Sequence, residues 1–243
     1  MSAFAKTAAL SANSGTTDSG VNSIDPTGFV KLGGQLPKLA TILAQAVDKL
    51  GLTLTEAQQR ALLLYLDQLL LWNKAYNLTA ITHPEEALIK HVIDCLAIIP
   101  HLPSGSLLDI GTGAGLPAVI IAICQPERSC TALDSNQKKI RFIRQISSEL
   151  GLSNVQPIAS RIEAHDASYD VVTSRAFASL IDFVEVAQPR LAPSGRLCAM
   201  KGKAPTDEER QSLAETWQIN TIKLNVPGLN ESRHLIEMFG KND

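Results

Sequence analysis

The chain has 243 residues, of which 45% are hydrophobic and 19% charged, and its formal net charge at pH 7 is -2. This length and apolar content suffice for one domain with a sizeable core and a small appendage. The near-neutral charge argues against charge-driven, nonspecific nucleic-acid binding, so any RNA contact must come from a local cationic patch. No apolar run reaches membrane-spanning length, and the four cysteines form no C-x-x-C pair, which favours buried free thiols over a metal site or disulfides.

Residues 1–34 are rich in Ser, Ala, Gly and Thr and show no hydrophobic periodicity, so we expect them to form a disordered tail. They contain no clear signal-peptide pattern. A transit peptide is only weakly supported, because the segment lacks Arg and contains Asp18 and Asp25. We therefore expect a cytoplasmic protein without a membrane anchor.

Apolar periodicity predicts an N-terminal helical segment over residues 35–101. The second helix begins with a capping-box pattern at Thr55, and the third has Pro84 in its first turn, where proline is favoured. The three predicted helices cover residues 36–50, 56 to about 76, and about 83 to just before Pro100.

Residues 102–243 alternate between strand and helix patterns, which predicts an α/β fold with a doubly wound, mostly parallel sheet of seven strands. Because the last two strands lack an intervening helix, we expect one of them to run antiparallel. We also expect a turn at Pro193-Ser194-Gly195. The predicted strands cover residues 107–110, 129–134, 155–158, 169–173, 196–200, 219–225 and 234–239, and the helices cover 118–124, 137–150, 180–188 and 207–217.

A glycine-rich turn follows the first predicted strand, with the pattern D-x-G-x-G-x-G from Asp109 through Gly111 and Gly113 to Gly115. In the dinucleotide fingerprint the third glycine comes one residue later, where this chain has Leu116. A carboxylate at Asp109 would repel a pyrophosphate but suits an ammonium or a ribose hydroxyl. S-adenosyl-L-methionine has both groups and no phosphate, so the pattern looks like the cofactor loop of class I methyltransferases. The alternatives are a dinucleotide site and a purely structural turn.

Three further segments follow predicted strands and are candidates for the cofactor crevice. Asp134 ends the second strand, where the glycine loop upstream favours a role in binding ribose hydroxyls; the alternative is a turn residue that caps the next helix. Ile162 and Glu163 follow the third strand, where the adenine ring would lie. Arg175 follows the fourth strand and could meet a phosphate or stack on a base, or it could be an ordinary surface residue.

Two polar clusters lie in the helical segment. His91 and Asp94 are three residues apart and so share a helix face, as either a substrate pair or a surface ion pair. Asn77 ends the second helix, as either a capping residue or part of a substrate-facing edge. Lys201 follows the fifth strand at the same edge of the sheet as Arg175.

Several of these segments together resemble the bacterial small-subunit ribosomal RNA guanine-N7 methyltransferase family, also called glucose-inhibited division protein B. The resemblance runs from about Leu50 to the C-terminus. The most specific segments are Trp-Asn-Lys-Ala-Tyr-Asn-Leu-Thr at 72–79 and Ser-Arg-Ala-Phe at 174–177. The other matching segments are Lys-His-x-x-Asp at 90–94, the glycine loop at 109–117, Leu-Asp-Ser at 133–135, Arg-Phe-Ile-Arg at 141–144, Ser-Arg-Ile-Glu at 160–163, Lys-Gly at 201–202 and Arg-His-Leu at 233–235.

The resemblance implies a Rossmann-like methyltransferase domain over residues 102–243 that methylates N7 of a guanine in 16S ribosomal RNA near the decoding region. It implies S-adenosyl-L-methionine as cofactor and the 16S rRNA or the small ribosomal subunit as partner. The chain departs from the family pattern in its long N-terminal tail and in Lys90, where arginine is common. By position, the family's cofactor contacts would be Gly111, Leu116, Ile162, Glu163 and Arg175.

Guanine N7 has an in-plane lone pair and no proton, so methyl transfer needs no obligatory general base, and positioning is the main task. The substrate-side candidates are Asn77, His91, Lys201 and Arg233. We expect a monomer. The competing hypotheses are a methyltransferase acting on another RNA, a protein or a small molecule, and a noncatalytic RNA-binding assembly factor with the same fold. An NAD-dependent dehydrogenase is disfavoured by the glycine spacing and by Asp109.

Overall fold

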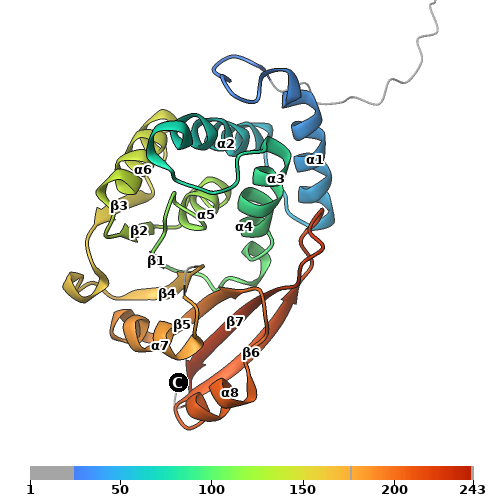
Figure 1. Cartoon of the computed structure of the whole chain (residues 1–243). Coiled ribbons are helices and arrows are strands. Elements are labelled where there is room, and N and C mark those ends of the chain that lie inside the picture. Colours follow the sequence, from blue (N-terminus) through green and yellow to red (C-terminus); the bar gives the residue numbers. More distant parts are fainter. Residues whose placement is uncertain (1–24, 176, 242–243) are drawn as a thin grey trace, which may run out of the picture.

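The computed structural model describes residues 25–175 and 177–241, which form a seven-stranded sheet with helices on both faces (Figure 1). The strand order is β3-β2-β1-β4-β5-β7-β6. Strands β1 to β5 pair in parallel, whereas β7 pairs antiparallel with both β5 and β6. The predicted sheet, including one antiparallel strand near its end, is confirmed. The strands are β1 Leu107–Ile110, β2 Cys130–Asp134, β3 Val155–Ala159, β4 Tyr169–Ser174, β5 Leu191–Lys201, β6 Trp217–Leu224 and β7 Arg233–Gly240.

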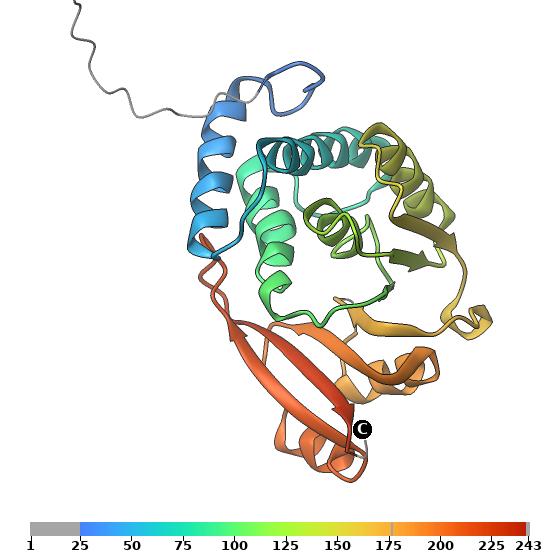
Figure 2. The same ribbon diagram turned by 180° about the vertical axis from the view of Figure 1, so that it is seen from behind.

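Two apolar cores cover the two faces of the sheet, because successive strand residues point to opposite sides. Leu107 faces the core made with α1, α2, α5 and α6, and Leu108 faces the core made with α7 and α8. Figure 2 shows the larger helical layer from behind. The helices are α1 Leu36–Lys49, α2 Glu56–Tyr76, α3 Pro84–Ala87, the π-helical turn η2 Leu88–Ile93, α4 Asp94–Leu96, α5 Ala118–Cys124, α6 Gln137–Glu149, α7 Leu180–Ala187 and α8 Asp207–Leu213.

The N-terminal helices share the core of the sheet and hold the glycine loop. The predicted capping box at the start of α2 is present, with Gln58 N donating to Thr55 Oγ1 at 3.2 Å and Thr55 N donating to Gln58 Oε1 at 2.9 Å. The same Gln58 side chain donates to the carbonyl of Ile123 at the end of α5, at 2.9 Å. The fully buried Tyr65 hydroxyl donates to the Ala114 carbonyl of the glycine loop at 2.9 Å. This hydrogen bond therefore fixes the glycine loop to helix α2.

Residues 25–34, which we expected to belong to a disordered tail, pack on α2. Leu32 is only 1% exposed, and the amides of Val30, Lys31 and Leu32 all donate to the buried carboxylate of Asp67. An acid on the apolar face of a predicted helix was the sequence signal for this contact. Residues 1–24 of the expected tail lie outside the described residues.

Two predicted boundaries near the C-terminus are wrong. The Pro193-Ser194-Gly195 turn lies inside β5, because the pairing with β4 moves from Tyr169–Leu191 to Val171–Arg196 and the residues between bulge out. The last predicted helix ends at Leu213 and not at Trp217. Trp217 instead begins β6 and pairs with Gly240, which leaves its side chain 6% exposed. Burial by a neighbouring strand outweighs local helical periodicity there.

No helix of the described ranges, 25–175 and 177–241, is both long and apolar enough to cross a bilayer.

Candidate functional site

The site lies where the strand order reverses. From β1 the chain adds β2 and β3 on one side of the sheet, and it then returns to place β4 on the other side of β1. In an open parallel sheet, a crevice for a ligand forms outside the carboxyl ends of the strands at this point. The segments predicted to bind the cofactor all lie at the carboxyl ends of strands β1 to β4.

The glycine loop after β1 is held by β2. The amides of Gly111 and Thr112 donate to the Leu133 carbonyl at 2.9 and 3.1 Å, and Gly113 N donates to Asp134 Oδ2 at 3.0 Å. Gly111, Gly113 and Gly115 have φ angles of 68°, 61° and 93°, in the left-handed region that favours glycine. A Cβ on Gly115 would lie 2.4 Å from Val119 Cγ2, whereas a Cβ on Gly113 would meet no atom within 4 Å. Gly115 thus serves packing, and Gly113 leaves open space for a ligand.

Asp109, in β1, binds the glycine loop and the start of α5. Its Oδ2 accepts hydrogen bonds from Thr112 Oγ1 at 2.6 Å and from Ala118 N at 3.1 Å. Its Oδ1 is buried and has no partner within the described chain. Burial of the fully enclosed carboxyl raises the pKa of Asp109 to about 7. Asp109 Oδ1 is therefore a buried acceptor beside the glycine loop that no described residue uses.

Asp134 also binds the loop. Besides Gly113 N, the carboxylate accepts from Asn136 N at 2.8 Å, and Lys139 Nζ lies 3.5 Å from Oδ2. Asn136, and not Asp134, is the N-cap of α6, so the alternative role that the sequence allowed for Asp134 belongs to its neighbour.

The other candidate cofactor residues differ in exposure. Leu116 is 4% exposed and packs in the larger core, so its side chain is structural. Ile162 is buried in the smaller core and Glu163 is exposed, both in the short 3-10 helix after β3. Arg175 follows β4 and is half-buried. Its charge offsets part of the rise in pKa that burial causes at Asp109 and Asp94, and its Nη1 lies 3.7 Å from Asp94 Oδ2.

A cavity of about 390 Å³, which we call the cationic cavity, is lined in part by Arg175. Because β7 is antiparallel to β5, its first residues lie beside the last residues of β5, with Lys201 paired to His234. The start of β7 and the carboxyl ends of β4 and β5 thus surround one cavity together with η2. The cavity is lined by Ile81, Lys90, His91, Asp94, Arg175, Met200, Lys201, Gly202 and Arg233.

Asp94 joins two arginines in this cavity. Its Oδ1 lies 3.2 Å from Arg233 Nε and its Oδ2 lies 3.7 Å from Arg175 Nη1. Arg175 also donates to the Lys90 carbonyl at 3.1 Å. Burial raises the pKa of Asp94, and the two guanidiniums offset part of that increase. Asp94 is 3% exposed, so the surface ion pair that the sequence left open is excluded.

His91 is a neutral member of the cavity. It is 6% exposed, and its Nε2 lies 2.7 Å from Thr79 Oγ1. Burial, helped by the charge of Arg175, lowers the pKa of His91 to about 4. At neutral pH the imidazole therefore contributes hydrogen bonding and not charge.

Lys201 lies in the cavity but binds backbone. Its ammonium donates to the carbonyls of Phe177, at 3.1 Å, and Ala178. It thereby holds the backbone of residues 177 and 178. Asn77 lies elsewhere: it is the left-handed C-cap of α2, with a φ of 51°, and its amide donates to the Asn73 carbonyl at 3.1 Å. The structure thus brings together His91, Lys201 and Arg233, but not Asn77.

Sequence comparisons agree with this geometry. Residues 58–236 match the model of a family described as rRNA small subunit methyltransferase G. The protein named ribosomal RNA small subunit methyltransferase G in Psychrobacter arcticus is 84% identical over 219 residues, covering 90% of this chain and 92% of the relative. Its namesake in Psychrobacter cryohalolentis is 78% identical over 242 residues, covering 100% of both chains. The one in Acinetobacter baumannii is 52% identical over 199 residues, covering 80% of this chain and 94% of the relative.

A comparison of structures supports the fold alone. The tRNA methyltransferase TrmK of Bacillus subtilis superposes with a TM-score of 0.50 at 17% identity, covering 63% of this chain and 67% of that one. The sequence matches extend over most of the chain and include the glycine loop, η2 and the start of β7. The chain therefore belongs to the rRNA small subunit methyltransferase G family.

Proposed function

We propose that this chain transfers a methyl group from S-adenosyl-L-methionine to N7 of a specific guanine in the 16S RNA of the small ribosomal subunit. Membership of the family supports the methyltransferase activity and the ribosomal RNA substrate. The observation that carries the proposal is that the glycine loop and the cationic cavity both lie at the carboxyl edge of the sheet, where Arg175 lines the cavity 3.7 Å from Asp94 and its charge also acts on Asp109.

The residues around the loop suit S-adenosyl-L-methionine. The open side of Gly113 admits the close approach of a ligand, and the unpartnered Oδ1 of Asp109 offers an acceptor for an ammonium. We assign Asp109 and Gly111 to the methionine end, Asp134 to the ribose hydroxyls, and Ile162 and Glu163 to the border of the adenine. Bound there, the cofactor would supply an electrophilic methyl group on a sulfonium.

The cationic cavity suits the RNA side. Arg175 and Arg233 attract the phosphate backbone, and the planar guanidiniums can also stack on a base. Lys90 is already paired with Glu86 and Glu231, whose carboxylates lie 3.1 and 3.2 Å from its ammonium. The neutral His91 can exchange a hydrogen bond with a base edge. Methylation at N7 leaves a positive charge on the purine, and the buried carboxyl of Asp94 limits the repulsion of that charge by the two arginines.

This assignment requires no general base. Guanine N7 attacks with its own lone pair and loses no proton, so the residues of the cavity align the base and do not deprotonate it. We further propose that the chain acts as a monomer in the cytoplasm, and light scattering after gel filtration tests the monomer.

The decisive experiment incubates the protein with tritiated S-adenosyl-L-methionine and small subunits that lack the modification, and it maps the product by chemical cleavage at N7-methylguanine. We expect one methyl group per particle at one guanine. Naked 16S rRNA in a parallel reaction distinguishes the free RNA from the assembled particle. A label on protein, or on another atom of the base, would contradict the proposal, and binding without transfer would favour an assembly factor.

A further inference from the structure

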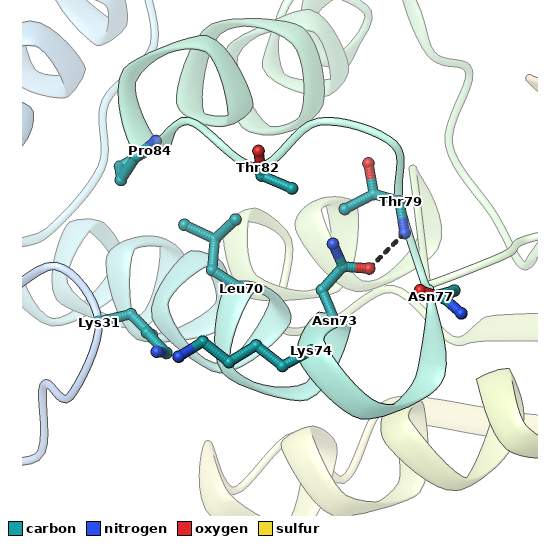
Figure 3. A pocket seen from close by; sticks show the side chains of 8 residues that line it. All are labelled: Lys31, Leu70, Asn73, Lys74, Asn77, Thr79, Thr82 and Pro84. Atoms are coloured by element: carbon teal, nitrogen blue, oxygen red, sulfur yellow. Dashed lines mark hydrogen bonds between the residues drawn. The ribbon is translucent and has the colours of Figure 1, made fainter.

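A second polar cavity, of about 460 Å³, lies beyond the cationic cavity, between the end of α2, the segment 79–84 and the N-terminal segment (Figure 3). Its polar lining is Lys31, Asn73, Lys74, Asn77, Thr79 and Thr82. Two of these side chains carry a positive charge, and none of the described residues that line it is acidic.

The two lysines converge on one side of this cavity. Figure 3 shows the ammonium groups of Lys31 and Lys74 pointing toward each other, and the neighbouring Lys74 ammonium lowers the pKa of Lys31. Within residues 25–175 and 177–241, neither ammonium is paired with a carboxylate. Two adjacent cations repel each other, and a bound anion would relieve that repulsion.

The backbone holds Lys31 in this place. The Asp67 carboxylate accepts the amide of Leu32 at 2.7 Å and the amide of Val30 at 3.0 and 3.1 Å, together with the amide of Lys31 itself. Asp67 is fully buried, and its oxygens are occupied by these amides. Asp67 therefore anchors the segment through its backbone and forms no ion pair with the Lys31 ammonium.

Neutral donors complete the cavity. Asn73 Oδ1 accepts the amide of Thr79 at 2.8 Å, which leaves the Nδ2 of Asn73 facing the cavity (Figure 3). The Thr82 side chain is exposed on the opposite wall. Ammonium groups and an amide are donors that phosphate oxygens accept in proteins.

The cavity is connected to the cationic cavity through one side chain. Thr79 lines this cavity, and its hydroxyl lies 2.7 Å from Nε2 of His91, which lines the other.

We propose that this cavity binds a backbone phosphate of the RNA substrate, next to the nucleotide that enters the cationic cavity. The proposal rests on the proposed function, because it assumes RNA as the substrate.

The test compares the double variant Lys31→Ala/Lys74→Ala with Lys49→Ala/Lys223→Ala. The control removes the same charge from two exposed lysines that line neither cavity. Binding to unmodified small subunits is measured at several salt concentrations, the KM and kcat of methylation are measured on the same particles, and cofactor affinity is measured by calorimetry.

We expect the Lys31/Lys74 variant to bind small subunits about tenfold more weakly than the control, with a slope of log affinity against log salt smaller by about one unit. Its KM should rise accordingly, while kcat and cofactor affinity stay unchanged. Lys31→Arg/Lys74→Arg, which keeps both charges, should restore binding.

Equal affinity and equal salt slope in the double variant and the control would overturn the phosphate site, whether or not the protein methylates RNA. If small subunits bind more weakly to the double variant than to the control but the wild type transfers no methyl group, the phosphate site stands and the proposed function fails. Absence of any binding by the wild type would overturn both.

Discussion

The backbone amide of Gly113 donates a 3.0 Å hydrogen bond to Oδ2 of Asp134, which joins the open turn of the glycine loop to the end of β2. Two residues that the sequence predicts to bind the cofactor thus depend on each other. A change at Asp134 alters the shape of the loop as well as any contact with a ribose.

Asp134→Ala should weaken the binding of S-adenosyl-L-methionine by about 10- to 100-fold, because the amides of Gly113 and Asn136 lose a charged acceptor. Asp134→Asn keeps one oxygen and should lose less. Calorimetry measures both affinities, and thermal unfolding verifies that the variants are folded. Wild-type affinity in Asp134→Ala would remove this residue from the cofactor site.

Gly113 and Gly115 should respond differently to the same substitution. In Gly113→Ala the new methyl enters open space, so the loss of stability should be limited to about 1 kcal/mol of left-handed backbone strain, while cofactor affinity falls. In Gly115→Ala the methyl would overlap Val119, and the stability loss should exceed about 2 kcal/mol. Urea unfolding and calorimetry on both variants test this contrast, and equal effects would contradict it.

Lys201→Ala should lower the rate of rRNA methylation about tenfold or more, with cofactor affinity nearly unchanged. The ammonium binds the carbonyls of Phe177 and Ala178, and without it these two carbonyls lose charge-assisted hydrogen bonds. The control is Lys203→Ala, an exposed lysine two residues further on. A large loss of cofactor affinity would instead place Lys201 in the cofactor site.

His91 should make the folded protein sensitive to acid. Its pKa is lowered from 6.5 to about 4 by burial, so between these values the unfolded chain binds a proton that the folded chain does not. Stability must therefore rise with pH across this window and fall on acidification, by about 3 kcal/mol in total for this group. Urea unfolding of the wild type and of His91→Gln between about pH 4.5 and about pH 7.5 should give curves that diverge toward acid. Parallel curves would show that the pKa of His91 is the same in the folded and the unfolded chain.

Asp67→Ala should destabilise the protein by about 2 kcal/mol or more, because the amides of Val30, Lys31 and Leu32 lose their common acceptor. Asp48→Ala, at an exposed position of α1, should change stability by less than about 0.5 kcal/mol. If both variants unfold at the same urea concentration, the N-terminal segment does not depend on Asp67.

The sequence by itself determined the local structure of this protein. The capping box at Thr55, the glycine turn after Asp109 and the alternation of strand and helix follow from backbone preferences and apolar periodicity within about 20 residues. These signals sufficed for the fold class, the position of the glycine loop and, with the resemblance, the family.

Only the tertiary structure decided which polar residues meet. Arg233 reaches Asp94 because β7 runs antiparallel beside β5. Lys31 lies beside Lys74 because the buried Asp67 on α2 accepts three backbone amides from a segment that resembles a disordered tail in composition. In the same way, Trp217 lies in a strand and not in the predicted helix because it pairs with Gly240 of β7. Pro193-Ser194-Gly195 lies inside β5 because β5 pairs with β4 both before and after it. Strand pairing and the burial of charged groups depend on partners far away in the chain, and for this reason local patterns could not predict them.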